Sequence, residues 1–433
     1  MEDEQGGRSL LLPALALGLL VGLVGAAFRL ALELATQARH AFVASAAATG
    51  LPGAAVSALV SAAGVGLAVW LVRRVAPETA GSGIQEIEGA LDGVRPLRWR
   101  RVIPVKFAGG ILAMGAGLIA GREGPTVQMG GALGRMLGEL GRRSPLETHV
   151  LVAAGAGAGL TAAFNAPLAG ILFVIEEMRP HFRYGARSTQ ALAAACVVAD
   201  VVIRALLGTR PEIEISHAPD PRLASLWLFA VLGALFGLLG PLFNALVLSV
   251  LDLFARVPRP LAAAAAVGAL VGALDWGAPV FVGGGYEVIG QALRGELAVG
   301  MLLVVFAART GGTALCYGAG APGGIFAPML ALGTLLGLWF GDLAAVWQPG
   351  LVPQPDVFTV AGMGALFAAV VRAPLTGIAL ALSITGDYQL LLPVLATCLS
   401  ATVVSYALGG APIYSLLLER TLRAGGAQAR RGG

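Results

Sequence analysis

Long uncharged runs, separated by short polar segments, make up most of the chain. The longest of these runs include residues 10–28, 51–72, 150–175, 223–251 and 310–341. Each reaches or exceeds the roughly 18 to 20 residues that a helix needs to cross a bilayer. Because alternation with a period of two residues is absent, a membrane β-barrel is not expected. The pattern therefore predicts an all-α integral membrane protein with many spans.

Glycine and proline interrupt this pattern at places where the chain also becomes charged. Residues 81–86, Gly-Ser-Gly-Ile-Gln-Glu, form a turn before a helix that is too short and too charged to cross a bilayer by itself. Residues 121–125, Gly-Arg-Glu-Gly-Pro, precede a helical pattern that extends to about residue 140. Broken helices are tolerated at membrane depth where they line a cavity, and their N-termini carry the positive end of the helix dipole.

The two halves of the chain share a pattern at one fixed offset of 207 positions, in which Gly155, Gly157, Ala166, Pro167, Leu168, Gly170 and Ile171 recur as Gly362, Gly364, Ala373, Pro374, Leu375, Gly377 and Ile378. So many identities in one register indicate an internal repeat. Two repeats with interrupted segments at corresponding positions are typical of a transporter whose site lies between the halves. We expect one transmembrane domain, with repeats at about residues 10–208 and 222–408 and a last helix at about 411–424.

The composition agrees with a membrane location, and it gives no reason to expect a nucleic acid, a metal or a cofactor as a partner. Hydrophobic residues make up 57% of the chain and charged residues only 12%, against about 25% charged in soluble proteins. The net charge of +4 comes from arginines scattered between spans, so no nucleic-acid surface is expected. The four histidines lack metal-ligand spacing, and we expect neither a metal nor a cofactor. The positive-inside rule places one arginine-rich loop in the cytoplasm, that of Arg95, Arg98, Arg100 and Arg101.

The interrupted segments could bring helix N-termini and hydroxyl groups to one point. Ser82 opens one short helix, Ile325 and Phe326 open another, and Tyr414 lies near the start of the last. Helix N–H groups and hydroxyls can replace the hydration shell of an anion without a full positive charge. Such binding is weak enough to release the ion again. Alternatively, Ser82 only caps its helix and Tyr414 lies at the membrane interface.

Glu123 is a carboxylate in apolar surroundings, which at membrane depth indicates a functional site. It would compete with an anion for the same donors, because a carboxylate satisfies them as a halide does. Burial favours its protonated form and helix N-termini favour its charged form, so it can titrate under ordinary conditions. One residue could then handle both an anion and a proton. The alternative is a loop contact in which Glu123 pairs with Arg122.

These motifs resemble those of the CLC family of chloride channels and chloride/proton exchangers, and the resemblance covers essentially the whole chain. Residues 121–125 match the glutamate signature of that family, residues 81–84 its serine signature and residues 324–328 its phenylalanine signature. Tyr414 matches its terminal tyrosine. The resemblance implies a CLC-type fold of two inverted repeats with many tilted and half-length helices.

The resemblance also implies roles for single residues. Glu123 is similar to the gating glutamate and proton carrier of the family. Ser82 and Tyr414 are similar to the hydroxyls that bind the central chloride, while Ile325 and Phe326 would bind it through their backbone N–H groups. These assignments make chloride and protons the expected partners.

Glu177 matches the inward glutamate through which exchangers of the family take protons from the cytoplasm, and which channels commonly lack. The implied function is a secondary active antiporter that exchanges chloride for protons. The alternative is a passive voltage- or pH-gated chloride channel on the same fold, and Ser82 argues against a fluoride-specialised variant. An intramembrane enzyme using Ser82 and His149 is not expected, because no catalytic motif supports it.

The resemblance further implies a homodimer with one pore per subunit, surrounded by lipid in a bacterial inner membrane. Helices at about residues 168–178 and 374–384 would form part of the dimer interface, and small residues would allow close contact there, namely Ala166, Ala169 and Gly170. No cytoplasmic regulatory domain is expected. Two positions depart from the family pattern: Gln85 replaces the usual proline of the serine signature, and Ser383 stands where relatives often carry glutamate.

Overall fold

The computed structural model describes residues 9–178, 185–209, 222–352 and 354–429. These residues form seventeen α-helices and four short 3₁₀ helices, and within them no β-sheet is present. The helices of the first half are α1 (Leu11–Ala48), α2 (Gly53–Val75), α3 (Ile84–Leu91), α4 (Trp99–Gly115), α5 (Glu123–Leu140), α6 (Pro145–Phe164), α7 (Pro167–Glu177) and α8 (Ala186–Leu207).

The helices of the second half are α9 (Leu226–Ala255), α10 (Pro260–Gly277), α11 (Tyr286–Leu293), α12 (Val299–Gly318), α13 (Phe326–Trp347), α14 (Asp356–Val371), α15 (Pro374–Thr385), α16 (Leu391–Ala407) and α17 (Ile413–Ala429). The 3₁₀ helices are η1 (Pro77–Thr79), η2 (Leu223–Ser225), η3 (Pro279–Phe281) and η4 (Tyr388–Leu390).

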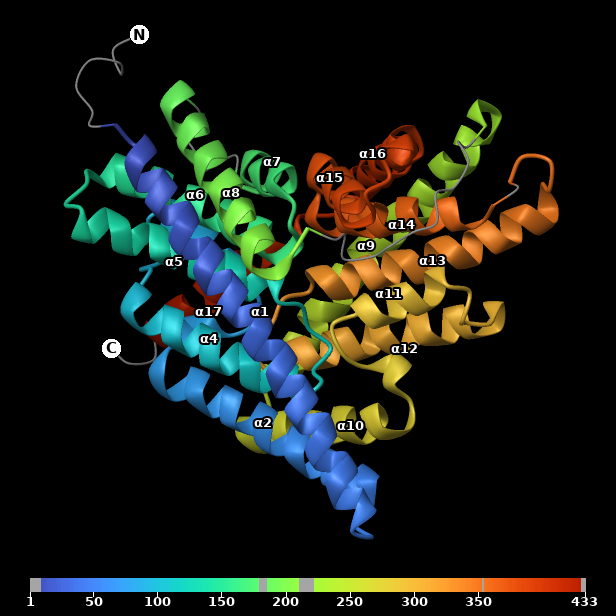
Figure 1. Ribbon diagram of the computed structural model, residues 1–433, viewed down its shortest axis with the longest axis horizontal. Coiled ribbons are helices and arrows are strands. Elements are labelled where there is room, and N and C mark those ends of the chain that lie inside the picture. Colours follow the sequence, from blue (N-terminus) through green and yellow to red (C-terminus); the bar gives the residue numbers. More distant parts are fainter. Residues whose placement is uncertain (1–8, 179–184, 210–221, 353, 430–433) are drawn as a thin grey trace.

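Eight of the described helices are long and apolar enough to cross a membrane, which confirms the predicted all-α membrane architecture. The longest, α1, runs diagonally across the molecule, while α7 and α15 lie side by side (Figure 1). At eight residues each, α3 and α11 are about 12 Å long and cannot cross a bilayer. The predicted mixture of full spans and half-length helices is therefore correct.

The first helix continues well past the uncharged run 10–28, because its charged residues find partners inside the protein. Arg29 donates from Nη1 to Oδ1 of Asn165 at 2.8 Å. Arg39 donates to Asp275 at 2.6 Å and to the carbonyl of Gly115 at 2.8 Å. Buried cations that are paired in this way need not end a helix.

The same chain break follows α6 and α14. Asn165 ends α6 with φ 55° and Arg372 ends α14 with φ 65°, both in the left-handed region. A proline then opens the next helix in each case, Pro167 in α7 and Pro374 in α15. Proline at a helix start is favoured because its missing N–H would have no acceptor there.

Pairs of glycines allow two pairs of helices, α5 with α6 and α13 with α14, to cross at very short distances. A β-carbon on Gly130 of α5 would lie 2.1 Å from the carbonyl oxygen of Gly155 on α6. A β-carbon on Gly333 of α13 would lie 2.2 Å from the carbonyl oxygen of Gly362 on α14. No larger residue fits either crossing without moving a helix backbone, so these glycines fix how α5 and α13 are held by the helices that follow them.

We expected Ala166, Ala169 and Gly170 to allow close contact at a subunit interface. This expectation was wrong, because all three lie inside the subunit. Ala166 and Ala169 are fully buried, and Gly170 approaches Thr161 and the carbonyl of Gly157 on α6. They serve the packing of α7 inside the subunit. The outer side of this helix presents Leu168 instead, which is 56% exposed.

Candidate functional site

The loops that precede α3, α5 and α13 are joined by backbone hydrogen bonds. Gly121 and Gly324 each donate an N–H to the carbonyl of the other at 2.7 Å. Gly81 donates to the carbonyl of Ala321 at 3.1 Å and accepts from the N–H of Gly323 at 3.0 Å. The three helices consequently start close together, and the sequence-predicted segments are indeed neighbours.

Lys106 on α4 fixes the loop that carries Ser82. Its fully buried ammonium donates to the carbonyls of Thr79 at 3.0 Å and Gly81 at 2.6 Å. Sequence reasoning passed over this residue, although an ionisable side chain in a membrane helix is a signal in itself.

Ser82 and Tyr414 are both fully buried, and their hydroxyls have no hydrogen-bond partner among the described residues. The two hydroxyls are near neighbours. Gly83, with φ 83°, occupies the N-cap position of α3, and no side chain caps that helix. Ser82 is therefore not a helix cap, and a buried tyrosine is not an interfacial one. Unsatisfied buried hydroxyls are costly in a folded protein, and they fit an acceptor such as a halide.

Ile325 and Phe326 lie at the start of α13, as N-cap and first helical residue. Both are buried, and their N–H groups belong to the first turn, where a helix offers them no internal acceptor. The ring of Phe326 stacks on that of Tyr414 with centroids 5.9 Å apart. It also packs against Phe367 at 4.7 Å. This aromatic cluster holds the Tyr414 hydroxyl in place beside the start of α13.

Glu123 is the first residue of α5 and is fully buried. Its Oε2 accepts from the N–H of Ala327, in the first turn of α13, at 3.4 Å, and its Oε1 accepts from the hydroxyl of Tyr286 at 2.7 Å. The backbone N–H of Glu123 itself and the nearby charge of Arg122 also act on the carboxylate. It occupies the positive end of α13, where an anion is favoured.

Arg122 makes different contacts from those of a simple loop ion pair. Its guanidinium donates to the carbonyl of Ala163 at 3.0 and 3.2 Å. It also lies over the ring of Tyr286, 4.8 Å from the centroid. The alternative in which Arg122 binds Glu123 directly is not what the described contacts show.

Two adjacent glutamates at the end of α7 have separate surroundings. Glu176 accepts from the N–H groups of Leu375 and Thr376, at 2.9 and 2.7 Å, and so caps α15. Glu177 is 9% exposed and lies beside the carboxyl of Glu88, a residue of α3 that is 2% exposed. Sequence reasoning missed Glu88, because in a short charged helix it resembles an ordinary surface residue.

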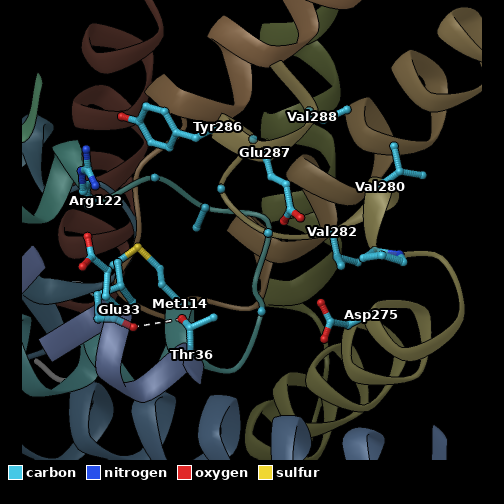
Figure 2. Close-up of a pocket in the computed structure, with 18 of the residues that line it drawn as sticks. Glu33, Thr36, Met114, Arg122, Asp275, Val280, Val282, Tyr286, Glu287 and Val288 are labelled. Atoms are coloured by element: carbon cyan, nitrogen blue, oxygen red, sulfur yellow. Dashed lines mark hydrogen bonds between the residues drawn. The ribbon is translucent and has the colours of Figure 1, made fainter. Parts of the chain in front are cut away.

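Two cavities approach this group of residues from its two ends. One, of about 430 Å³, reaches Gly121 and Arg122. Figure 2 shows Arg122 and Tyr286 on one side of it and Asp275 on the opposite side, with the Glu287 carboxylate between them. The other, of about 340 Å³, reaches Gly81, Tyr317 and Gln85, and Arg95 and Arg420 also line it.

Gln85 faces the second cavity at the position where the family pattern has proline. Its side chain is 8% exposed, and its Oε1 has no partner among the described residues. The hydroxyl of Tyr317 accepts the N–H of Ser82 at 3.3 Å on the same side. Polar groups thus line the way from this cavity to Ser82. The described residues contain no group of three His, Cys, Asp or Glu side chains placed to hold a metal.

A family model described as voltage gated chloride channel matches residues 64–406. The H(+)/Cl(−) exchange transporter ClcA of Vibrio cholerae is 49% identical over 421 residues, which cover 96% of this chain and 90% of that protein. The protein of the same name from Salmonella paratyphi A is 48% identical over 437 residues, which cover 98% of this chain and 90% of that protein.

Two solved structures extend the similarity to three dimensions. The crystal structure of a slow cyanobacterial Cl−/H+ antiporter has a TM-score of 0.93 and 42% identity, and covers 97% of this chain and 99% of that chain. The crystal structure of a eukaryotic CLC transporter has a TM-score of 0.80 and 25% identity, and the match covers 94% of this chain and 73% of that chain.

Proposed function

The chain belongs to the voltage-gated chloride channel (CLC) family, and on this premise we propose that it is a secondary active antiporter exchanging chloride for protons across a bacterial inner membrane. In this proposal Glu123 is both the gate on the anion path and the proton carrier. Glu177 transfers protons on the cytoplasmic side. Ser82 and Tyr414 bind chloride through their hydroxyls, and Ile325 and Phe326 through their backbone N–H groups.

The position of the Glu123 carboxylate is the observation that carries the proposal. It accepts from the first turn of α13, and its neighbour Gly124 lies against the hydroxyl of Ser82. While ionised, Glu123 satisfies the donors that would otherwise bind a second anion there. When protonated it no longer competes, because a neutral carboxyl is a weaker acceptor and carries no charge. Proton binding and anion entry are thereby linked at one residue.

The anion path runs between the two cavities, past Glu123 at one end and Ser82 at the other. The cavity beside Ser82 carries Arg95, which belongs to the loop that the positive-inside rule assigns to the cytoplasm. The cavity beside Arg122 then faces the outside. Arginines near a pore entrance raise the local concentration of chloride and speed its capture.

The proton path on the inner side uses a carboxyl pair. Glu177 and Glu88 are buried side by side. Two neighbouring buried carboxylates repel each other, which favours a proton between them. A group of this kind can receive a proton and pass it on. A passive chloride channel would not need it, which favours the exchanger over the channel.

Repeats and assembly complete the proposal. We propose one transmembrane domain of two inverted repeats, which the equivalent breaks at Asn165 and Arg372 support. We also propose a homodimer with one pore per subunit. Adjacent helices α7 and α15 expose Leu168 and Leu375, which are 56% and 43% exposed and suit an apolar contact with a second subunit.

Flux from liposomes tests the proposed function. The purified protein is reconstituted with a chloride gradient and no initial pH gradient, and a pH electrode follows the external solution. An exchanger drives protons uphill as chloride runs down, so a pH change is expected that a protonophore abolishes. Chloride flux without proton movement would identify a passive channel and contradict the proposal.

A further inference from the structure

We propose that Tyr286 is a positioning residue of the gate: its hydroxyl holds the ionised Glu123 carboxylate in the blocking position and releases it on protonation. The inference rests on the proposed function of Glu123 as a gate. Its basis is the hydrogen bond of 2.7 Å from the Tyr286 hydroxyl to Oε1 of Glu123, across 163 positions of the chain.

The backbone brings Tyr286 to Glu123 through a turn that only glycine allows. Tyr286 is the first residue of α11, and Gly285 precedes it with φ 112°. A β-carbon on Gly285 would lie 2.7 Å from the β-carbon of Ala331 and 3.2 Å from the carbonyl oxygen of Ala327. Because Ala327 also donates its N–H to Glu123, one segment of α13 positions both the tyrosine and the carboxylate.

Arg309 on α12 holds the loop that leads to this turn. Its guanidinium, 1% exposed, donates to the carbonyls of Val280 at 3.0 Å, Val282 at 2.7 Å and Gly283 at 2.7 Å. A loop held at three carbonyls does not move freely. Tyr286 is consequently pre-organised, so little conformational entropy is lost when its hydroxyl binds the carboxylate.

Arg122 reinforces the tyrosine from its ring face. The guanidinium lies 4.8 Å from the ring centroid, in the geometry of a cation–π contact. It holds the ring in place and its positive charge polarises the phenol toward donation. Arg122 thus acts on Glu123 both through its own nearby charge and through the tyrosine that it stacks on.

The hydroxyl distinguishes the two states of the gate. A hydrogen bond donated to a carboxylate is about twice as strong as one donated to a neutral carboxyl. Tyr286 therefore stabilises the ionised gate at α13 more than the protonated gate. The charged and titratable groups around the carboxylate are Arg122 beside it, Tyr286 on α11 and Arg309 behind the turn. Farther out, the cavity is also lined by Glu33, Arg39, His40, Asp275 and Glu287.

The Tyr286→Phe variant tests the proposal, because it keeps the ring and its stacking on Arg122 while removing only the hydroxyl. Losing a hydrogen bond to a charged group should make the ionised gate leave its position about tenfold more readily. The midpoint of the chloride flux against pH should then move about one unit to higher pH. The ratio of protons to chloride should stay as in the unmodified protein.

The same substitution in a Glu123→Ala background separates this role from a direct effect on the pore. With no carboxylate to hold, Tyr286→Phe should leave the chloride flux of Glu123→Ala unchanged. An unshifted pH profile of the single variant, or an equal effect in both backgrounds, would overturn the proposal. The readout is chloride flux, so it remains informative if the unmodified protein moves no protons, an outcome that would instead defeat the exchanger function.

Discussion

Removing the two unpartnered hydroxyls should have different effects on chloride binding and on the stability of the chloride-free protein. The variant is Ser82→Ala combined with Tyr414→Phe, which deletes two oxygen atoms from a fully buried site. The proposed site predicts weaker chloride binding. It also predicts that the chloride-free protein loses no stability, because the deleted hydroxyls have no partner among the described residues.

The magnitudes follow from the hydrogen bonds involved. A hydrogen bond to a charged group contributes about 1.5 to 3 kcal/mol, so losing one weakens binding about tenfold or more. Because the two hydroxyls are neighbours, their effects need not add, and we expect a rise in the dissociation constant of about 10- to 100-fold. An unsatisfied buried hydroxyl costs about 1 to 3 kcal/mol, so the chloride-free variant should be equally stable or more stable.

Calorimetric titration with chloride, and thermal unfolding with and without chloride, measure the two effects. Chloride at about 100 times its dissociation constant stabilises a protein by about 2.7 kcal/mol. At the same chloride concentration the variant, which binds about 10- to 100-fold more weakly, should retain only about 1.4 to 0.4 kcal/mol of this gain. Ser45→Ala with Tyr388→Phe is the matched control, since it removes the same atoms from exposed positions. Unchanged affinity, or an equal loss of stability with and without chloride, would refute the reasoning.

The adjacent glutamates of α7 should respond in contrasting ways. Glu177→Gln should abolish proton movement, keep chloride flux and leave thermal stability nearly unchanged, because it removes the inner proton acceptor but not the anion path; uphill proton pumping by this variant would sink the assignment. Glu176→Ala should lower the free energy of unfolding by about 2 kcal/mol, because α15 loses its cap, while the remaining transport stays coupled. Lost coupling at normal stability would move the proton role to Glu176.

The sequence predicted those parts of the site that rest on local backbone chemistry. Glycine and proline marked the starts of α3, α5 and α13, and the uncharged runs marked the spans. Ser82 and Glu123 stand at such starts and Tyr414 is the second residue of α17, so their neighbourhood could be anticipated. The extent of α1 could not, because Arg29 and Arg39 are satisfied by residues far away in the chain.

The residues that surround the predicted ones were found only in three dimensions. Tyr286 reaches Glu123 across 163 positions and Lys106 supports Gly81 across 25, and no local pattern announces either contact. Glu88 is polar within a charged helix, so its burial against Glu177 depends on how α7 packs. Contacts of this kind depend on tertiary packing, which periodicity and motif spacing do not encode.

The central claim is that one carboxyl group handles both ions, and Glu123→Gln tests it most directly. Glutamine has nearly the same size and stays neutral at every accessible pH, so it cannot carry a proton or compete as an anion. Chloride and proton flux are recorded together from liposomes at two pH values, with the unmodified protein in parallel. We predict chloride flux that no longer depends on pH and no coupled proton movement. Retained, pH-dependent proton coupling in this variant would contradict the account.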